Sequence, residues 1–562
     1  MPPTKEADTV TQTLTTSLTL VSLLLVLPQG ALAQSTPTPV PASPPTAGSA
    51  APPPSAAPPV APPPPAVTAP SSPPGPPPTA PPPPPQVDPA PPVVAQSGAP
   101  VEFTSLRLMR DKGVISPGEY ESAVHDLAET SGMRAPDEGT LVVSKWATTL
   151  YGFVEDDNIY DTTRSFNDSA GNALVARANT QAGENGRFTM GVRNSRIGFR
   201  MAAPELSGGI RTSAQLEMDF LGTQLPVGSV QPYQGTEAAY FTNPTFRVRH
   251  ANFKIETPIV DFLVGQYWQL FGWGSAYQPN SVEIQGLPGE VYARTPQVRI
   301  SKTLKANPVT FEIAVAAVRP VQRDSAMPDG EGGLRLALDS WTGVQTVGAT
   351  GTQIAPLSIA ATGLIRHVAV DNYAAKPTYT NDLGMSAFAV DGFVPVIPGT
   401  KHRKDNSLSL NGEFATGYGF ADMYTGLTGG ITFPALPNPM AAATPPTYTP
   451  DIDNGIVTYD SKGGLHGIQW TSYLLGLQYY LPGVDGRIWV SGNFSHMSSA
   501  NSHFYGAAAA TLASEDWFDA NLFFAPTPAI RVGVEYANFN NQYVDGQHAI
   551  NHRGQLSGFF VF

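Results

Sequence analysis

Arginines stand at alternate positions in several short segments, each opposite a row of apolar residues. Arg196 and Arg200 share one face of such a segment, and Ile197, Phe199 and Met201 share the other. A guanidinium group stays charged and binds a carboxylate through two parallel hydrogen bonds, so a row of arginines along one wall favours anions. The candidate anion-handling residues, found by this pattern or in the long loop expected from Gly272 to Pro296, are Arg196, Arg200, Arg211, Arg247, Arg249, Arg294, Arg299 and Arg531.

Each single arginine also has a simpler interpretation, as a wall charge paired with a nearby carboxylate. Glu217, Asp219, Glu312 and Glu535 fall on the same faces as the arginines. A pore with a positively charged wall facing a negatively charged wall would explain why both arginines and acidic residues lie on these faces. Taken together, the arginines favour a positively charged lining on this face of the strands.

Catalytic motifs are missing from the sequence. It contains no His-Glu-x-x-His zinc motif, no phosphate-binding Gly-rich loop with Lys and no Gly-x-Ser-x-Gly elbow between a strand and a helix. The nine histidines are scattered. We therefore expect neither an enzyme nor a bound cofactor or metal.

The elements that must position the arginines are strands. From Ile210 to Phe220 apolar and polar residues alternate, and the same pattern recurs at Val309–Val315 and Ile530–Tyr536. A period of two is typical of a strand with two different faces. The assignment of faces is least secure from His250 to Glu256, because a bulge would shift the alternation there.

Three features favour a membrane barrel over a soluble sandwich. The chain ends on Leu556–Phe562, with Leu556, Phe560 and Phe562 on one face, and such an apolar edge strand would promote aggregation in a soluble protein. Phe560 and Phe562 resemble the terminal signal read by the barrel-assembly machinery. Aromatic residues gather near strand ends, and short turns such as Leu481–Gly486 alternate with long loops, as in outer-membrane barrels. At roughly 26 residues per strand with its loop, this region holds about 16 antiparallel strands.

The chain before the barrel divides into three parts. Residues 1–33 have an apolar run followed by Ala31-Leu32-Ala33, which predicts an export signal peptide. Residues 34–100 are rich in Pro and Ala and predict a disordered spacer, which could contact peptidoglycan or serve only as a linker. Residues 101–138 predict a short helical hairpin with a Ser116–Glu119 capping box, and residues 139–562 the barrel.

Composition narrows the class further. The 562 residues include no cysteine, so disulfides and thiol metal sites are excluded. The net charge of −13 argues against binding to nucleic acid. No stretch after the signal is apolar enough for a membrane helix, so the predicted fold class is all-β.

The stretch from Asn194 to Leu304 resembles the DcaP-like family of outer-membrane porins. The likeness is carried by Ser195–Arg200, Phe246–Ala251, Gly265–Trp268 and the run from Pro279 to Arg299. The resemblance implies a 16-stranded homotrimer with a periplasmic N-terminal segment that passes small anions such as dicarboxylates. Here that segment is short and follows a Pro-rich spacer, which departs from the family.

The predicted function is passive diffusion of small hydrophilic, mainly anionic solutes across the outer membrane. The expected surroundings are membrane lipid and lipopolysaccharide, with the N-terminal region in the periplasm. The run Lys401–Lys404 would be a loop, with external lipopolysaccharide contact as one hypothesis. Two alternatives stay open: a barrel that tethers the cell wall with little pore activity, and, more distantly, a barrel enzyme.

Overall fold

A computed structural model describes most of the chain from Trp146 to Phe562, together with 140–143 and Met109, Arg110, Lys112 and Val114. The chain divides into two compact units, 1–93 and 94–562, and all of the described residues belong to the second. The ranges outside the described residues are 1–108, 111, 113, 115–139, 144–145, 171–173, 207, 223–242, 284–285, 323–324, 373–377, 402, 425–451, 453–454, 461–463 and 503–510. The predicted signal peptide, spacer and all but four residues of the predicted hairpin therefore lie outside the described part.

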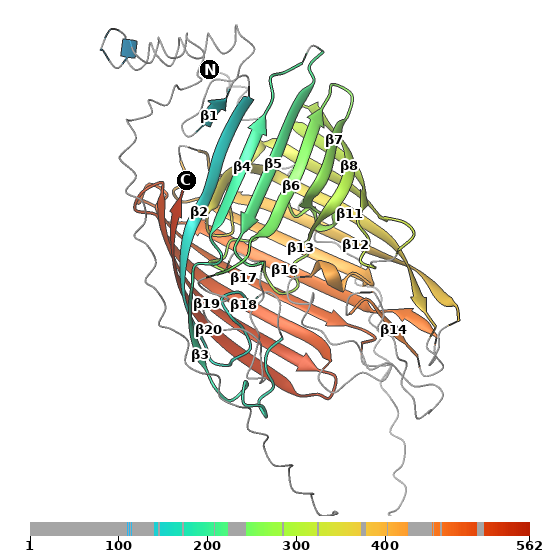
Figure 1. Cartoon of the computed structure of the whole chain (residues 1–562). Coiled ribbons are helices and arrows are strands. Elements are labelled where there is room, and N and C mark those ends of the chain that lie inside the picture. Colours follow the sequence, from blue (N-terminus) through green and yellow to red (C-terminus); the bar gives the residue numbers. More distant parts are fainter. Residues whose placement is uncertain are drawn as a thin grey trace, which may run out of the picture. The chain divides into compact units, whose positions relative to one another are not determined.

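The described residues form a closed antiparallel barrel of 16 wall strands, which confirms the predicted fold class and strand number. Figure 1 shows the strands side by side around the wall. No helix among the described residues is long and apolar enough to cross a membrane. The wall strands are β2 (Trp146–Asp161), β3 (Arg187–Gly191) with β4 (Arg196–Ala202) as one interrupted strand, β5 (Arg211–Asp219), β6 (Arg247–Glu256), β7 (Asp261–Trp268), β8 (Arg294–Ala306), β9 (Val309–Val318), β10 (Asp329–Val347), β11 (Gly351–Asp371), β12 (Thr380–Ile397), β13 (Leu408–Tyr418), β16 (Gln469–Tyr480), β17 (Ile488–Ser499), β18 (Leu512–Phe524), β19 (Ile530–Tyr543) and β20 (His548–Val561).

The barrel closes between its first and last wall strands. β20 pairs with β19 on one side and with β2 on the other, from Phe153↔Val561 to Asp161↔Arg553. Gly152 and Phe562 exchange backbone hydrogen bonds of 2.9 and 3.0 Å just beyond this ladder. Closure satisfies the backbone donors and acceptors that an open sheet would expose. The short strand β1 (Thr140–Val143) pairs with β2 where β20 has ended.

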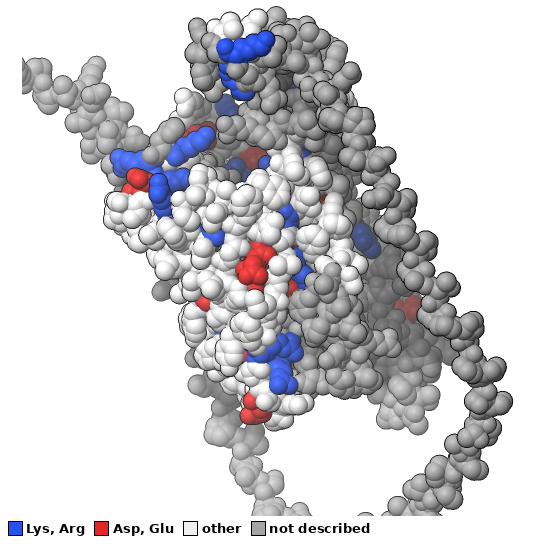
Figure 2. Space-filling model, turned by 60° about the vertical axis from the view of Figure 1, so that its left-hand side comes forward, with Lys and Arg blue, Asp and Glu red and all other residues white. Residues whose placement is uncertain are grey.

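The two faces of the wall differ as the alternation predicts. Along β20, exposed and buried residues alternate almost without interruption. Leu556 and Phe560 point outward and are about half exposed, whereas Arg553 and Ser557 point inward and are fully buried. Figure 2 shows that the outer face around this part of the barrel is largely uncharged over its middle. An apolar outside and a polar inside are the reverse of a soluble sandwich.

The connections at the two ends of the barrel differ in length, as predicted. The end that carries the C-terminus has the short turns 203–210, 257–260, 307–308, 348–350, 398–407, 481–487 and 525–529. The other end has all of the longest connections, 162–186, 220–246, 269–293, 419–468 and 500–511, together with the shorter 319–328, 372–379 and 544–547.

The turn 481–487 shows how local sequence makes a short connection. Gly483 and Gly486 adopt positive φ angles of 76° and 66°, which Gly takes without strain. The Asp405 carboxylate accepts backbone hydrogen bonds from Gly483, Val484 and Asp485 at 3.0–3.2 Å, and a further one from Gly486. Asp405 lies in the connection 398–407, as does the basic run Lys401–Lys404. Contact of that run with lipopolysaccharide stays a prediction.

Three long connections fold back against inward-facing wall residues. They are 162–186, 269–293 with the 3-10 turn η2 (Phe271–Trp273), and 419–468 with η3 (Ala421–Met423), β14 (Val457–Tyr459) and β15 (Leu465–Gly467). Their buried apolar members include Phe166, Val175, Phe271, Trp273, Phe420 and Ile456. The barrel interior is therefore partly packed rather than an empty cylinder.

Arg553 joins the closing strand to this interior. Its Nε and Nη2 bind the two carboxylate oxygens of Asp161 on β2 at 3.0 and 2.9 Å. Its Nη1 binds Glu283 of the connection 269–293 at 3.1 Å. All three side chains are at most 4% exposed, so each charge depends on its partners.

Replacing Arg553 tests this dependence. We expect Arg553→Met to lower the free energy of unfolding by about 3–5 kcal/mol, because two buried carboxylates lose their cation. Arg211→Met is the matched control, since Arg211 and Glu256 are 64% and 30% exposed and such pairs contribute about 0–1 kcal/mol. Urea unfolding in lipid vesicles measures both, and equal losses would contradict the structural role of Arg553.

Candidate functional site

The candidate site is the inward face of the wall from β4 to β8, where most of the predicted arginines lie. Arg247 on β6 binds Asp219 on β5 through two hydrogen bonds, Nε to Oδ1 at 3.0 Å and Nη2 to Oδ2 at 2.5 Å. Arg249 bridges Glu217 at 2.8 Å and Asp219 at 3.1 Å. Arg196 on β4 lies 3.6 Å from Glu217. For these three arginines the structure shows the simpler, paired arrangement.

A bulge in β6 turns one more side chain inward at this point. The register shifts so that Glu217 pairs with His250 and Met218 pairs with Val248. Arg249 and His250, although adjacent in sequence, are therefore both buried at 1% and 4% exposure. This is the stretch where the alternation could not assign faces.

Four of the predicted arginines have no carboxylate within 4.0 Å among the described residues: Arg200, Arg294, Arg299 and Arg531. Arg200 lies over the ring of Tyr151, 4.1 Å from its centroid. Such contacts with an aromatic face leave the guanidinium charge unneutralised.

Arg294 and Arg299 stand on β8, beside the paired cluster. Arg294 lies over the rings of Trp268 and Tyr292, at 4.6 and 4.9 Å. Arg299 donates to Gln297 at 2.9 Å and to the Trp268 carbonyl at 2.5 Å, both neutral acceptors. Together with Arg196, Arg247 and Arg249, Arg294 makes a group of four guanidinium ions around two carboxylates.

The pKa of the Tyr292 hydroxyl is lowered by the positive charges of this cluster. Its hydroxyl accepts a hydrogen bond from Arg249 Nη2 at 3.2 Å. Burial raises the pKa of Tyr292, but the nearby guanidinium groups of Arg249, Arg294 and Arg196 outweigh burial and bring the pKa down to about 8. The guanidinium groups therefore favour the ionised form of Tyr292 by more than burial disfavours it.

The remaining two predicted arginines lie apart from this cluster. Arg211 is at the exposed end of β5, 3.6 Å from Glu256. Arg531 is on β19, where it donates to the Ala349 carbonyl at 2.8 Å. Phe560 and Phe562, the predicted assembly signal, point outward with 52% and 44% exposure.

The connection 269–293 is held against the inward face of the wall by three glutamates. Glu331 on β10 accepts the backbone N–H groups of Leu270 and Phe271 at 2.8 and 3.2 Å. Glu535 on β19 accepts those of Val282 and Glu283 at 2.8 and 2.9 Å.

The third contact lies near the end of the connection. Glu413 on β13 accepts the N–H of Val291 at 2.8 Å. Because β10, β13 and β19 stand at different positions around the wall, these acceptors hold the connection at several points along its length. Its last residues, among them Tyr292, then lead into Arg294 at the start of β8, in the arginine cluster.

Sequence reasoning missed several inward arginines, and three of those among the described residues are buried. Arg193 pairs with Asp168 at 3.3 Å, Arg553 with Asp161, and Arg366 on β11 with Asp329 and Asp422 at 2.8 and 2.6 Å. The alternation around Arg366 and Arg553 would have placed both inward. All three are paired and buried, which fits a structural role.

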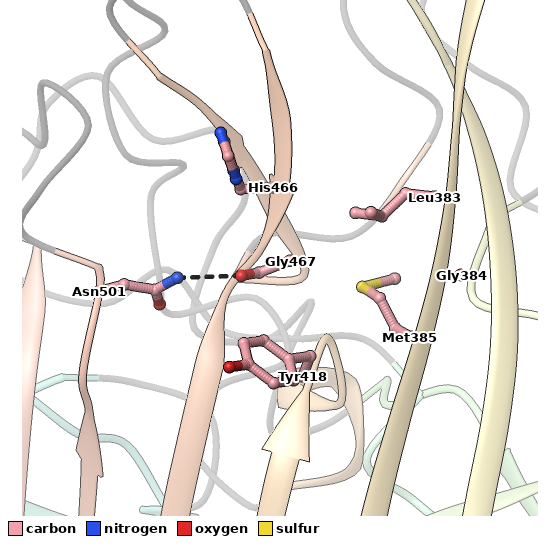
Figure 3. Close-up of a pocket in the computed structure, with 7 residues that line it drawn as sticks. All are labelled: Leu383, Gly384, Met385, Tyr418, His466, Gly467 and Asn501. Atoms are coloured by element: carbon pink, nitrogen blue, oxygen red, sulfur yellow. Dashed lines mark hydrogen bonds between the residues drawn. The ribbon is translucent and has the colours of Figure 1, made fainter.

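A surface pocket of about 380 Å³ lies at the long-loop end of the wall. Figure 3 shows Leu383 and Met385 of β12 pointing toward the hairpin β14–β15, with Tyr418 at the end of β13. Asn501 Nδ2 donates to the Gly467 carbonyl at 3.0 Å and closes one side. None of the predicted arginines lines the pocket, and its Met385 pairs with Arg366 of β11 across the ladder. In the part of the chain that is described, no three His, Asp or Glu side chains are arranged to hold a metal ion.

Comparison with known proteins bears on the fold. No protein-family model and no curated protein sequence matches this chain. The structure is similar to the outer membrane channel DcaP of Acinetobacter baumannii, with a TM-score of 0.52 and 16% identity over 75% of this chain and 99% of that chain. The chain shares the fold of that channel. The resemblance predicted from sequence is confirmed at this level.

Two other barrels are similar at lower scores. OmpF of Salmonella typhi, in complex with daunomycin, has a TM-score of 0.42 and 9% identity over 75% of this chain and 100% of that one. The anion-selective porin of Comamonas acidovorans has a TM-score of 0.41 and 11% identity over 74% and 100%.

The three wall glutamates provide a test of how the connection 269–293 is held. We expect Glu331→Leu and Glu535→Leu each to loosen it, at about 1–3 kcal/mol for each buried N–H that loses its acceptor. Glu331→Leu removes the acceptor of two such groups, and Glu535→Leu that of Glu283, since the Val282 N–H also donates to Asn521 at 3.0 Å. Limited proteolysis should then cut within 269–293. Glu312→Leu is the control, since Glu312 faces inward but pairs with Arg335 on the wall. Resistance to cleavage equal to that of the control would contradict the anchoring.

Proposed function

We propose that this protein is an outer-membrane porin through which small hydrophilic solutes diffuse passively, with a preference for anions of the dicarboxylate class. The observation that carries the proposal is the closed barrel with an apolar exterior and an interior wall of arginines. A closed barrel spans a membrane without exposed backbone groups. A water-filled interior lined by charge then selects solutes by sign and size.

The arginines supply the proposed preference in two ways. Arg247 and Arg249 are held by Glu217 and Asp219, and they keep the wall ordered. Arg294 and Arg299 lack a carboxylate partner among the described residues, so their charge adds to the positive potential of this wall. Arg299 is only 8% exposed and would act on an anion through its field, whereas a carboxylate could hydrogen-bond to Arg294. The lowered pKa of Tyr292 supports a positive potential at this place.

The remaining parts of the proposal concern location and partners. An export signal at residues 1–33 and a periplasmic N-terminal region agree with short turns at the end that carries the C-terminus. The long connections would then face the outside, among lipopolysaccharide. We further propose a homotrimer, insertion by the barrel-assembly machinery through Phe560 and Phe562, and passage of the spacer 34–100 toward peptidoglycan.

Conductance in a planar lipid bilayer under a salt gradient tests the function. We expect stepwise openings with a reversal potential that favours anions. Arg294→Gln and Arg299→Gln should each reduce anion preference, because one unit charge at several Å in water is worth about 0.5–1 kcal/mol, or about two- to fivefold in occupancy. Arg211→Gln, at the exposed rim, is the control.

The outcomes separate the alternatives. Openings with cation preference would keep the porin and remove the arginine argument. Absence of conductance from a folded barrel would favour the wall-tethering role. Equal effects of Arg294→Gln and Arg211→Gln would show that the cluster does not set the preference.

A further inference from the structure

The hairpin that joins β10 to β11 leaves the barrel wall near its tip. β10 pairs with β9 as far as Leu338, and β11 pairs with β12 from Ser358 onward. Between these residues the two arms pair with each other, out to Val347↔Gly351, and with no wall strand in the described part of the chain. We call residues 342–356 the hairpin tip. Such a strand pair has a backbone edge on each side that no neighbouring strand satisfies.

The tip folds inward across the short-turn end of the barrel. Alternate residues of a wall strand face lipid and stay exposed, but residues 343–346 of the tip are all buried. The Ala349 carbonyl accepts a hydrogen bond from Arg531 Nη1 on β19 at 2.8 Å. Along the wall, β12, β13, β16, β17 and β18 stand between β11 and β19. At roughly 4.8 Å between neighbouring strands, that distance is on the order of 30 Å, so the tip must cross the interior to reach Arg531.

Side chains of the wall satisfy the free edge of the tip. Ser409 Oγ on β13 and Gln478 Nε2 on β16 donate to the Val344 carbonyl at 2.9 and 3.3 Å. Gln478 Oε1 accepts the Thr346 N–H at 3.0 Å, and the Tyr480 hydroxyl lies 2.8 Å from Thr346 Oγ1. The backbone groups that an edge strand leaves open are therefore bonded while the tip is in its inward position.

Apolar packing also fixes the tip in this position. Val344 and Ala349 are 1% and 0% exposed and pack in one cluster with Phe153 of β2, Trp489 of β17 and Phe523 of β18. β2 stands on the far side of the wall from β10. Burial of these side chains excludes water from the part of the barrel cross-section that the tip occupies.

The connection 269–293 rests on the tip from the other side. Asn280 Nδ2 donates to the Gly348 carbonyl at 2.6 Å, and Gln345 Nε2 donates to the Ala276 carbonyl at 2.8 Å. The same connection leads into the arginine cluster at the start of β8. A solute that has passed the arginines must therefore also pass the tip before it leaves the barrel at the short-turn end.

We propose that the hairpin tip is a second constriction of the pore and determines the largest solute that can pass. The inference rests on the proposed porin function. The arginines of β4 to β8 act on the charge of a solute. The tip is held against the wall mainly by neutral hydrogen bonds and apolar side chains, so it limits solutes by size, whatever their charge.

Removal of the tip tests the proposal. Residues 339–356 are replaced by an Asn-Gly turn, which joins Leu338 to Leu357, its partner in the ladder. The matched control replaces 482–487 by Asn-Gly, because that turn lies at the same end and joins Leu481 to Ile488, which share a backbone hydrogen bond of 3.0 Å. In swelling liposomes we expect the variant without the tip to admit uncharged sugars that the wild type and the control exclude, and its single-channel conductance to rise.

Each other outcome bears on the proposal. Conducting proteins with the same size limit, with and without the tip, overturn the constriction and leave the porin. A silent wild type beside a conducting variant without the tip supports the constriction and shows that the tip closes the pore. Silence of both folded proteins overturns the constriction and the porin together. The reversal potential reports on the arginines separately.

A second measurement covers the case in which the variant without the tip fails to fold. The chain has no cysteine, and Gln353 in the tip and Pro482 in the turn 481–487 are both exposed at the short-turn end. We expect a bulky maleimide to lower the single-channel conductance of Gln353→Cys and to leave that of Pro482→Cys unchanged. Equal effects at the two positions overturn the proposal.

Discussion

Closure of the sheet between β2 and β20 is the constraint on which the rest of the structure depends. In a membrane no water is available to an open edge, so the ladder from Phe153↔Val561 to Asp161↔Arg553 must exist before the barrel is tolerated. Once the wall is closed, each strand has one face toward lipid and one toward the interior. The apolar residues then belong outside, and every charge that points inward must find a partner or water.

The inward-facing charged residues fall into groups that differ in what each charge contacts. Arg193, Arg366 and Arg553 are buried and paired, and they connect the folded-back connections to the wall. Arg247 and Arg249 share two carboxylates with Arg196, whereas Arg294 and Arg299 are held by rings and neutral acceptors. Glu331, Glu413 and Glu535 are used differently again, as acceptors for backbone N–H groups of 269–293. The wall from β4 to β8 thus has more positive than negative charge. The glutamates of β10, β13 and β19 position the connection 269–293.

Local periodicity accounts for much of what could be predicted. It placed Arg196, Arg200 and Arg211 on one face and Leu556, Phe560 and Phe562 on another, because a strand has only two faces. It placed Arg249 inward correctly but could not assign His250, because a bulge turns this second neighbour inward as well. The role of Glu535 could not be read either, since its contacts with Val282 and Glu283 span about 250 positions of sequence.

The central claim is that charge on the interior wall controls which solutes pass. Swelling of liposomes that contain the protein measures this directly, with a small dicarboxylate, an uncharged solute and a diamine of similar size. The account predicts the fastest swelling with the dicarboxylate and the slowest with the diamine, and a smaller difference for Arg294→Gln. Equal rates for all three solutes, or faster entry of the diamine, would contradict it.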